Sequence, residues 1–210
     1  FVAAMEDVLS VYTRPHDADR PLLCLDETSK QLTAETRAFM PMAPGIPARH
    51  DHEYKRNGTA NLFMLFAPLE GWRHVKPTAR RGAIDYAHVL KEICDVHFPQ
   101  AEAIVLVQDN LNTHGPSSLY RAFPAAEARR IVERFEWHYT PKHGSWLNMA
   151  EAELSVLARQ CLARRIPDIE TLKQQVEAWL QRRNKHHVKA KWRFTNQDAR
   201  IKLKNLYPAL

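Results

Sequence analysis

The chain has 210 residues, of which 26% are charged, and a formal net charge of +6 at pH 7. It is long enough for one sizeable hydrophobic core without disulfide or metal staples, and its modest positive charge slightly favours a polyanionic partner. The three cysteines are far apart and odd in number, which argues against a disulfide framework.

Several classes of protein are disfavoured by what the sequence lacks. No apolar stretch approaches the roughly 20 residues of a membrane span, and the first residues have no secretory pattern, so we expect a cytoplasmic protein without a membrane partner. The six glycines form neither a Walker-type loop nor a dinucleotide fingerprint, so we expect no nucleotide cofactor. The eleven histidines show no spaced metal-binding pair, and we predict no zinc site.

Apolar spacing predicts an alternation of helices and strands. Residues 1–12 have the pattern of the later part of a helix and begin with Phe1, so we expect a fragment of a longer protein. A short apolar run from Pro21 to Leu25 predicts a central strand that ends at Asp26. The further predicted elements are a loop over 38–52, hairpin strands 61–67 and 72–77, a helix 83–98, a strand 103–107, a helix 125–134, a strand 135–139, a loop 140–144, and two helices, one with an apolar stripe over 147–161 and one capped by Asp168. This order is typical of a mixed α/β fold.

Two carboxylates, Asp26 and Asp109, each follow an apolar run that has the character of a buried strand. A single aspartate at the end of a strand is ordinary. If the two strands are parallel neighbours, however, the side chains lie about 5 Å apart, and like charges so close stay ionised with a cation between them. The pair therefore indicates a hard divalent cation such as Mg²⁺, which binds one or two carboxylates together with phosphate and water.

A third acidic ligand has two candidates, Glu151 and Glu153. Both lie in the predicted helix, on opposite margins of its apolar stripe. Helical periodicity does not separate them, and a solvated helix flank explains either glutamate equally well.

Three segments together carry a resemblance to a known family: residues 24–27, residues 107–114, and residues 139–151, which include the run from Trp146 to Asn148 before Glu151. They resemble the catalytic domain of bacterial insertion-sequence transposases of the Tc/mariner superfamily. The resemblance covers nearly the whole chain. It implies a ribonuclease-H-like mixed sheet flanked by helices, with Asp26, Asp109 and Glu151 on the positions of the catalytic acidic triad.

The same resemblance implies the domain organisation and the reaction. Residues 1–20 are expected to be the end of an upstream helix and a linker, 21–165 the catalytic domain, and 166–210 a C-terminal helix and basic tail packed on it. The domain would cut and join double-stranded DNA at transposon ends with two Mg²⁺ or Mn²⁺ ions, Asp26 bridging both and Asp109 and Glu151 each holding one. The full-length protein would be a nucleoid-associated homodimer with an upstream DNA-binding region.

Two departures and two alternatives accompany this resemblance. About forty residues separate Asp109 from Glu151, which is longer than is usual for mariner elements and suggests an insertion between Gly115 and Arg134. A ribonuclease-H-like nuclease that never joins strands would use the same carboxylates. A catalytically silent remnant that binds DNA or dimerises is the second alternative.

Polar residues near the triad are further candidates. Asn110, Asn112 and His114 follow Asp109 and could orient a bound water or a phosphate, although a hydrogen-bonded turn explains them equally well. Lys142 and His143 precede a helix N-terminus, where anions are favoured. Trp146 is predicted to lie in the core. Phosphate contact is also plausible for a set of basic residues on predicted loops and hairpin edges: His50, His52, Lys55, Arg56, Arg73, Lys76, Arg80 and Arg81.

Overall fold

The computed structural model describes residues 1–37, 41–47 and 52–207. The predicted loop over 38–52 lies partly outside these residues, as does His50. The elements in chain order are α1 (Val2–Tyr12), β1 (Leu22–Glu35), β2 (Tyr54–Ala67), β3 (Trp72–Thr78), α2 (Ala83–Glu92), η1 (Ile93–His97), β4 (Ile104–Gln108), α3 (Pro116–Ala122), α4 (Ala125–Val132), β5 (Phe135–Tyr139), η2 (Ser145–Leu147), α5 (Met149–Leu157), η3 (Ala158–Leu162), α6 (Ile169–Lys185), α7 (Asn196–Lys202) and η4 (Lys204–Leu206).

The strands form one five-stranded sheet in the order β3-β2-β1-β4-β5. The first three strands in the sequence are antiparallel neighbours, whereas β4 pairs in parallel with both β1 and β5. The parallel strand β4 is buried along its whole length, as expected of a strand covered on both faces. The mixed sheet confirms the predicted α/β class.

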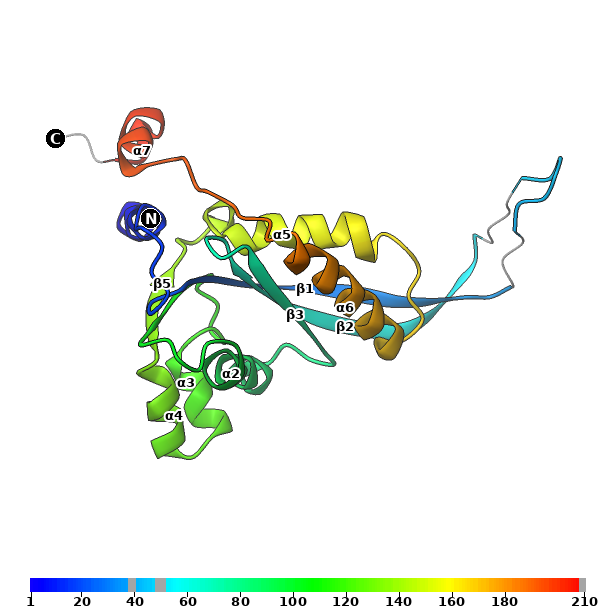
Figure 1. Cartoon of the computed structure of the whole chain (residues 1–210), viewed down its shortest axis with the longest axis horizontal. Helices are drawn as coiled ribbons and strands as arrows, with labels where there is room; N and C mark the ends of the chain where they lie inside the picture. The colour runs from blue at the N-terminus through cyan, green and yellow to red at the C-terminus, as the bar shows by residue number, and fades with distance from the viewer. Residues whose placement is uncertain (38–40, 48–51, 208–210) are drawn as a thin grey trace.

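Helices cover both faces of the sheet and give three layers (Figure 1). One hydrophobic cluster joins the sheet to α1, α5 and α6, and a second joins it to α2, α3 and α4. Alternating residues of β1 supply the two clusters: Cys24 belongs to the first and Leu23 and Leu25 to the second. This alternation follows from the two-residue period of a strand, and it fixes which residues of β1 face α5.

The strand β1 is longer than its sequence predicts. It does not end at Asp26 but continues to Glu35, and its second half pairs with β2 as far as the Glu35 and Tyr54 pair. Together with the paired part of β2, it extends beyond the rest of the sheet as an arm (Figure 1). Its residues are mostly polar and half exposed, so an apolar run could not reveal it. Pairing with β2 satisfies the backbone hydrogen bonds there.

Two helices were not predicted, α3 and α7. The helix α3 has seven residues and begins with Pro116, and together with α4 it fills the stretch between Asp109 and β5 in which the sequence suggests an insertion. Such short helices carry too little periodicity to be recognised. By contrast, the predicted cap of α6 is confirmed, because the Asp168 carboxylate accepts a 2.7 Å hydrogen bond from the Thr171 backbone N–H.

The segment after α6 returns across the sheet edge toward the N-terminus. The Ala190 N–H donates to the carbonyl of Pro68 at 3.0 Å, and the ring of Trp192 lies 5.1 Å from that of Tyr12. Beyond it, Arg200 of α7 pairs with Glu6 of α1 at 2.8 Å. The helices α1 and α7 therefore lie side by side over the face that carries α5 (Figure 1). Within the described residues, no helix has the length and apolar character that crossing a membrane requires.

Candidate active site

The register of the sheet places Asp26 and Asp109 on adjacent strands. Cys24 of β1 pairs with Val107 of β4 in parallel, and each aspartate lies two residues further along its strand direction. Asp26 shares the face of Cys24, toward α5. The sequence-based expectation that the two strands are parallel neighbours is therefore confirmed.

The start of α5 brings Glu151 to the same place. Asn148 caps this helix, because its side-chain oxygen accepts from the Ala150 N–H at 3.1 Å, and its amide donates to the carbonyl of Leu25 at 2.8 Å. Leu25 directly precedes Asp26, so a buried side chain links the helix N-terminus to the strand at the acidic site. Glu151 lies in the first turn of the helix and is exposed, where its charge is favoured by the helix dipole.

The helix α1 supports this junction from the other side. The Tyr12 hydroxyl donates to the Leu147 carbonyl at 2.6 Å and lies 3.4 Å from the Met149 N–H, which donates to it. Tyr12 is buried beside Cys24, whose sulfur lies 3.6 Å from the hydroxyl. The residues before and after the Asn148 cap are thus held to α1 as well as to β1.

Three neighbouring carboxylates affect the protonation of Asp26. Burial raises the pKa of Asp26, and the charges of Asp109, Glu27 and Glu151 raise it further, while a hydrogen bond from the Glu27 N–H opposes them; the result is a pKa of about 7. Such repulsion shows that the folded chain gathers negative charge at this point. Asp26 and Glu151 line one open groove together with Lys30, Ser145 and Ser155.

A histidine links Asp109 to a carboxylate that sequence reasoning missed. His114 Nδ1 bonds Asp109 Oδ1, and its Nε2 lies 3.0 Å from Glu27 Oε2. Burial alone would lower the pKa of His114, but the bonds to Asp109 and Glu27 outweigh it and raise that pKa to about 9. The ring also stacks on Tyr86, with centroids 4.7 Å apart. His114 therefore holds Asp109 in one orientation as a positively charged partner.

The sequence did not indicate Glu27 as a site residue, because no apolar run ends at it. It lies within β1, one residue beyond the predicted end of the strand. It points to the opposite face from Asp26, and its side chain is 5% exposed. The sequence shows that Glu27 follows Asp26, but it does not show that Glu27 contacts His114, which lies 87 positions away. Pairing over such a separation needs the tertiary fold.

The alternative third acid, Glu153, faces a different environment. Its carboxylate is buried and receives hydrogen bonds from Arg183 Nη2 at 2.8 and 3.0 Å, and Arg73 Nε lies 3.0 Å away. Arg73 is fully buried and also donates to the carbonyls of Gly71 and Val188. The cations of Arg73 and Arg183 thus already neutralise Glu153, although this residue lies only two positions after Glu151 in α5.

Other predicted site residues lie near the acidic site or away from it. Asn110 and Asn112 are exposed in the turn after β4, and Lys142 and His143 are exposed in the loop before η2. His143 has a left-handed backbone with φ of 64°. The prediction that Trp146 is a core residue is wrong: it is 44% exposed and stacks on Trp192, with centroids 6.2 Å apart.

The predicted basic residues do not form one surface. Arg73 is fully buried, and Lys76 bonds Glu92, so an assignment of these two to phosphate contact is corrected. Strand alternation turns both side chains toward packed helices. Among the residues that the structure describes, those that remain exposed are His52, Lys55, Arg56, Arg80 and Arg81.

The match to a family model decides the affiliation of the chain. The model for the DDE superfamily endonuclease matches residues 21–173, about three quarters of the sequence. The chain belongs to the DDE superfamily endonuclease family. Its match begins just before β1 and ends in α6, so it spans all five strands and includes Asp26, Asp109 and Glu151.

Solved structures with the same fold come from the mariner Mos1 system. The Mos1 mariner paired-end complex with Mn aligns with a TM-score of 0.56 and 17% identity, over 89% of this DDE family chain and 56% of that chain. The Mos1 strand transfer complex aligns with a TM-score of 0.58 and 16% identity, over 89% of this chain and 55% of that one. The Mos1 paired-end complex with Mg aligns with a TM-score of 0.54 and 18% identity, over 89% of this chain and 59% of that chain.

These alignments confirm the ribonuclease-H-like arrangement of the sheet and helices expected from the resemblance. The chain spans little more than half the length of the Mos1 chains. A search among curated proteins found no significant match to the sequence.

Proposed function

We propose that this chain is the catalytic domain of a DNA transposase that cleaves DNA strands at transposon ends and joins them to a target. The observation that carries the proposal is the position of three acidic residues in a chain of the DDE family: Asp26 within β1, Asp109 directly after β4 and Glu151 in the first turn of α5. They are close enough for the charges of Asp109 and Glu151 to act on Asp26. The Mos1 structures, which contain paired transposon ends and a strand transfer complex, support the choice of reaction.

Divalent cations fit the residues present. The site consists of carboxylate oxygens, the ligands that Mg²⁺ and Mn²⁺ prefer. Burial, together with the charges of the neighbouring carboxylates, raises the pKa of Asp26 to about 7, and a bound cation would offset both effects. We propose that Asp26, Asp109 and Glu151 hold two such ions, and that Glu153 is excluded because two arginines already pair with it. The Mos1 complexes with Mn and with Mg are consistent with this choice.

The roles of the residues follow from their positions. Bound divalent ions would stabilise the charge that develops on the phosphate and activate the attacking water or 3′-hydroxyl. The three carboxylates fix the ions, His114 and Glu27 keep Asp109 in place, and Asn148 keeps Glu151 in reach of Asp26. Because direct attack by water or a 3′-hydroxyl requires no covalent enzyme intermediate, the same residues would serve cleavage and joining.

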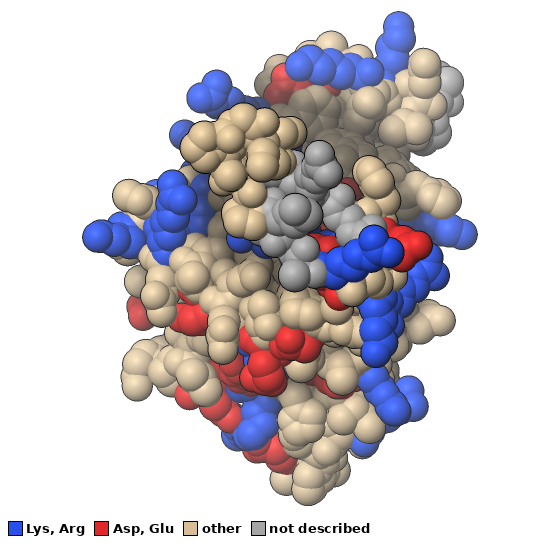
Figure 2. Space-filling model, turned by 90° about the vertical axis from the view of Figure 1, so that its right-hand side faces the viewer, with Lys and Arg blue, Asp and Glu red and all other residues tan. Residues whose placement is uncertain are grey.

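DNA is the substrate that the surface around the site suits. Figure 2, viewed from the side on which the β1 arm projects, shows acidic side chains gathered in the central and lower part of this face and lysine and arginine side chains around its margins. Lys142 before η2 and Arg81 before α2 are exposed basic residues near the site, and Arg81 Nη1 lies 3.9 Å from Glu27 Oε1. Exposed basic residues attract the phosphate backbone, and Asp26, Asp109 and Glu151 with bound cations would act on it.

The proposal is tested by cleavage and strand transfer on a labelled duplex that carries transposon ends, with Mg²⁺ or Mn²⁺, in the protein that contains this chain and the region encoded upstream of it. Joined products that disappear in Asp109→Asn and Glu151→Gln, and persist in the exposed control Glu102→Gln, would support it. Cleavage without joining would favour a nuclease, and a parent protein that binds DNA without cutting it would favour a silent remnant.

A further inference from the structure

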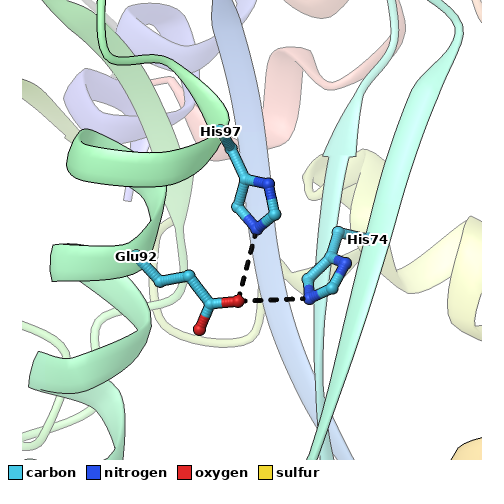
Figure 3. Close-up of side chains that lie close together, drawn as sticks. All are labelled: His74, Glu92 and His97. Atoms are coloured by element: carbon cyan, nitrogen blue, oxygen red, sulfur yellow. Dashed lines mark ion pairs between the residues drawn. The ribbon is translucent and has the colours of Figure 1, made fainter.

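A second group of potential metal ligands lies at the edge of the sheet, between β3 and the end of α2. His74 of β3, Glu92 of α2 and His97 of η1 turn their side chains toward one another (Figure 3). Glu92 Oε1 lies 3.6 Å from His74 Nε2 and 3.5 Å from His97 Nε2. The three ligand atoms are all within 4.8 Å of one another.

These distances are close to those of a tetrahedral metal centre. A Zn²⁺ ion with bonds of about 2.0–2.1 Å keeps its ligand atoms roughly 3.3 Å apart. The two distances from Glu92 to the histidines are within a few tenths of an ångström of this value, and the two histidine nitrogens lie within 4.8 Å of each other. Two imidazoles and one carboxylate are a set that suits Zn²⁺ and leaves one position for water or another ligand. Mg²⁺ prefers oxygen ligands, so this set differs in metal preference from the acidic site.

A π-helical turn makes the arrangement possible. Glu92 and His97 are five residues apart, a spacing that points in different directions on an α-helix. In η1 the chain widens to i→i+5 hydrogen bonds, as between the Phe98 N–H and the Ile93 carbonyl at 2.9 Å, and residues five apart then share a face. The spacing therefore gives no metal signal in the sequence, from which no zinc site is predicted.

The burial and packing of the histidines favour a bound cation. The Nε2 atom of His97 is buried without a hydrogen-bond partner, and such an atom is costly to leave unpaired. Trp72 packs against both rings, with centroids 6.3 Å from His74 and 5.0 Å from His97.

Charged neighbours define how strongly the site would bind. The ammonium of Lys76 bonds Glu92 Oε2 and leaves Oε1 to face the histidines. Lys76 therefore competes with a cation for Glu92 and should weaken its binding.

The cluster is accessible and separate from the acidic site. A groove lined by Glu70, Gly71, Trp72, His97, Phe98, Asn184 and His187 reaches it from solvent. His74 pairs with Leu65, which faces the α2 layer, whereas Asp26 pairs with Met64, which faces the α5 layer. The two groups thus lie on opposite faces of the sheet.

We propose that His74, Glu92 and His97 form a Zn²⁺ site that ties the edge strand β3 to the junction of α2 and η1. The ion would replace the weak contacts between the three side chains with coordination bonds. It would satisfy His97 Nε2, and it would stabilise the edge of the sheet independently of the reaction at Asp26.

The test is calorimetric titration of Zn²⁺ into the untagged protein, stripped of metal with a chelator and kept in excess Mg²⁺ to occupy the acidic site. Co²⁺ absorption in the visible range reports imidazole coordination in parallel. We expect one Zn²⁺ per chain, and at least tenfold weaker binding in His74→Gln and in His97→Gln. The matched control is His88→Gln on the exposed side of α2, which should bind as the parent does.

Thermal unfolding provides a second readout that does not depend on DNA cleavage. Zn²⁺ should raise the melting temperature of the parent and of His88→Gln by a few degrees, and it should not change that of His74→Gln or His97→Gln. Lys76→Met should bind Zn²⁺ more tightly than the parent. The proposal is overturned if the parent binds no Zn²⁺ in excess Mg²⁺, or if the His74 and His97 variants bind it as well as the parent does.

Discussion

Two glutamates on one helix turn of α5 have opposite environments. Glu151 is exposed beside Asp26 and Asp109, and among the residues that the structure describes no cation pairs with its carboxylate. Glu153 is buried between Arg73 and Arg183. The acidic site gathers like charges that destabilise the fold, whereas the single carboxylate of Glu153 is paired with two arginines. We interpret the uncompensated charge of Glu151 as that of a metal ligand and the compensated charge of Glu153 as structural.

The largest effect should come from exchanging these two carboxylates for amides in the strand-transfer assay. Glu151→Gln should reduce the rate by roughly 10²-fold or more, because an amide keeps the shape and loses the charge that holds a cation. Glu153→Gln should retain cleavage and joining at a temperature where it is folded. A rate lost in Glu153→Gln and kept in Glu151→Gln would reverse the assignment of the third acid.

The same two substitutions should have the opposite order of effect on the free energy of unfolding. Glu153→Gln leaves Arg73 buried with no carboxylate beside it, and breaking a buried pair costs about 3–5 kcal/mol in the free energy of unfolding. Glu151→Gln should change that free energy by less than about 0.5 kcal/mol, as is usual for exposed positions. Urea denaturation monitored by circular dichroism measures both, and equal losses in the two variants would contradict the comparison.

The pH dependence of the metal-free protein should reveal the repulsion at Asp26. Its pKa is about 7 in the folded state, against an ordinary value near 3.9 in an unfolded chain. The folded state therefore holds the proton more tightly, and the contribution of Asp26 to the free energy of unfolding should fall by about 1–3 kcal/mol as pH rises from about 4 to 7.

Denaturation in a chelator across that pH range tests the expectation, with Asp26→Asn as the comparison. The variant has no titrating group at this position and should lose less stability over the same interval. Added Mg²⁺ should restore stability in the parent, most strongly near and above pH 7, where Asp26 is ionised. Parallel pH curves for the two proteins would show that Asp26 is not the group responsible.

A smaller effect is expected from the link between the helix and the strand. Asn148→Asp keeps the oxygen that caps α5 and loses the amide donor to the Leu25 carbonyl. It should cost about 1 kcal/mol of stability and raise the Mg²⁺ concentration needed for half-maximal activity, because Glu151 is no longer fixed relative to Asp26. Asn148→Ala, which also removes the cap, should cost roughly 1 kcal/mol more.

The metal dependence separates positioning from simple destabilisation. A variant that is merely less stable, such as Glu153→Gln, should keep the parent's Mg²⁺ requirement at a temperature where it is folded. If Asn148→Asp has the parent's Mg²⁺ requirement as well, then its bond to Leu25 contributes to stability alone.

Much of the architecture follows from patterns that are local in the sequence. The apolar run before Asp109 predicts the buried strand β4, and Asp168 predicts the start of α6, because strand burial and helix capping are decided by neighbouring residues. The full length of β1 was missed, since its polar half becomes a strand by pairing with β2. Whether the 1–20, 21–165 and 166–210 segments are separate units stays a prediction.

The sequence by itself determined the fold class, the family resemblance, and Asp26 and Asp109 as candidates, since each was inferred from a local pattern such as the apolar run before each aspartate. Only the tertiary structure decided that Glu153 is neutralised by Arg73 and Arg183, that His114 joins Glu27 to Asp109, and that His74 meets Glu92 and His97. Charge compensation depends on distance in space, and the fold alone brings together side chains that lie 18 to 87 positions apart.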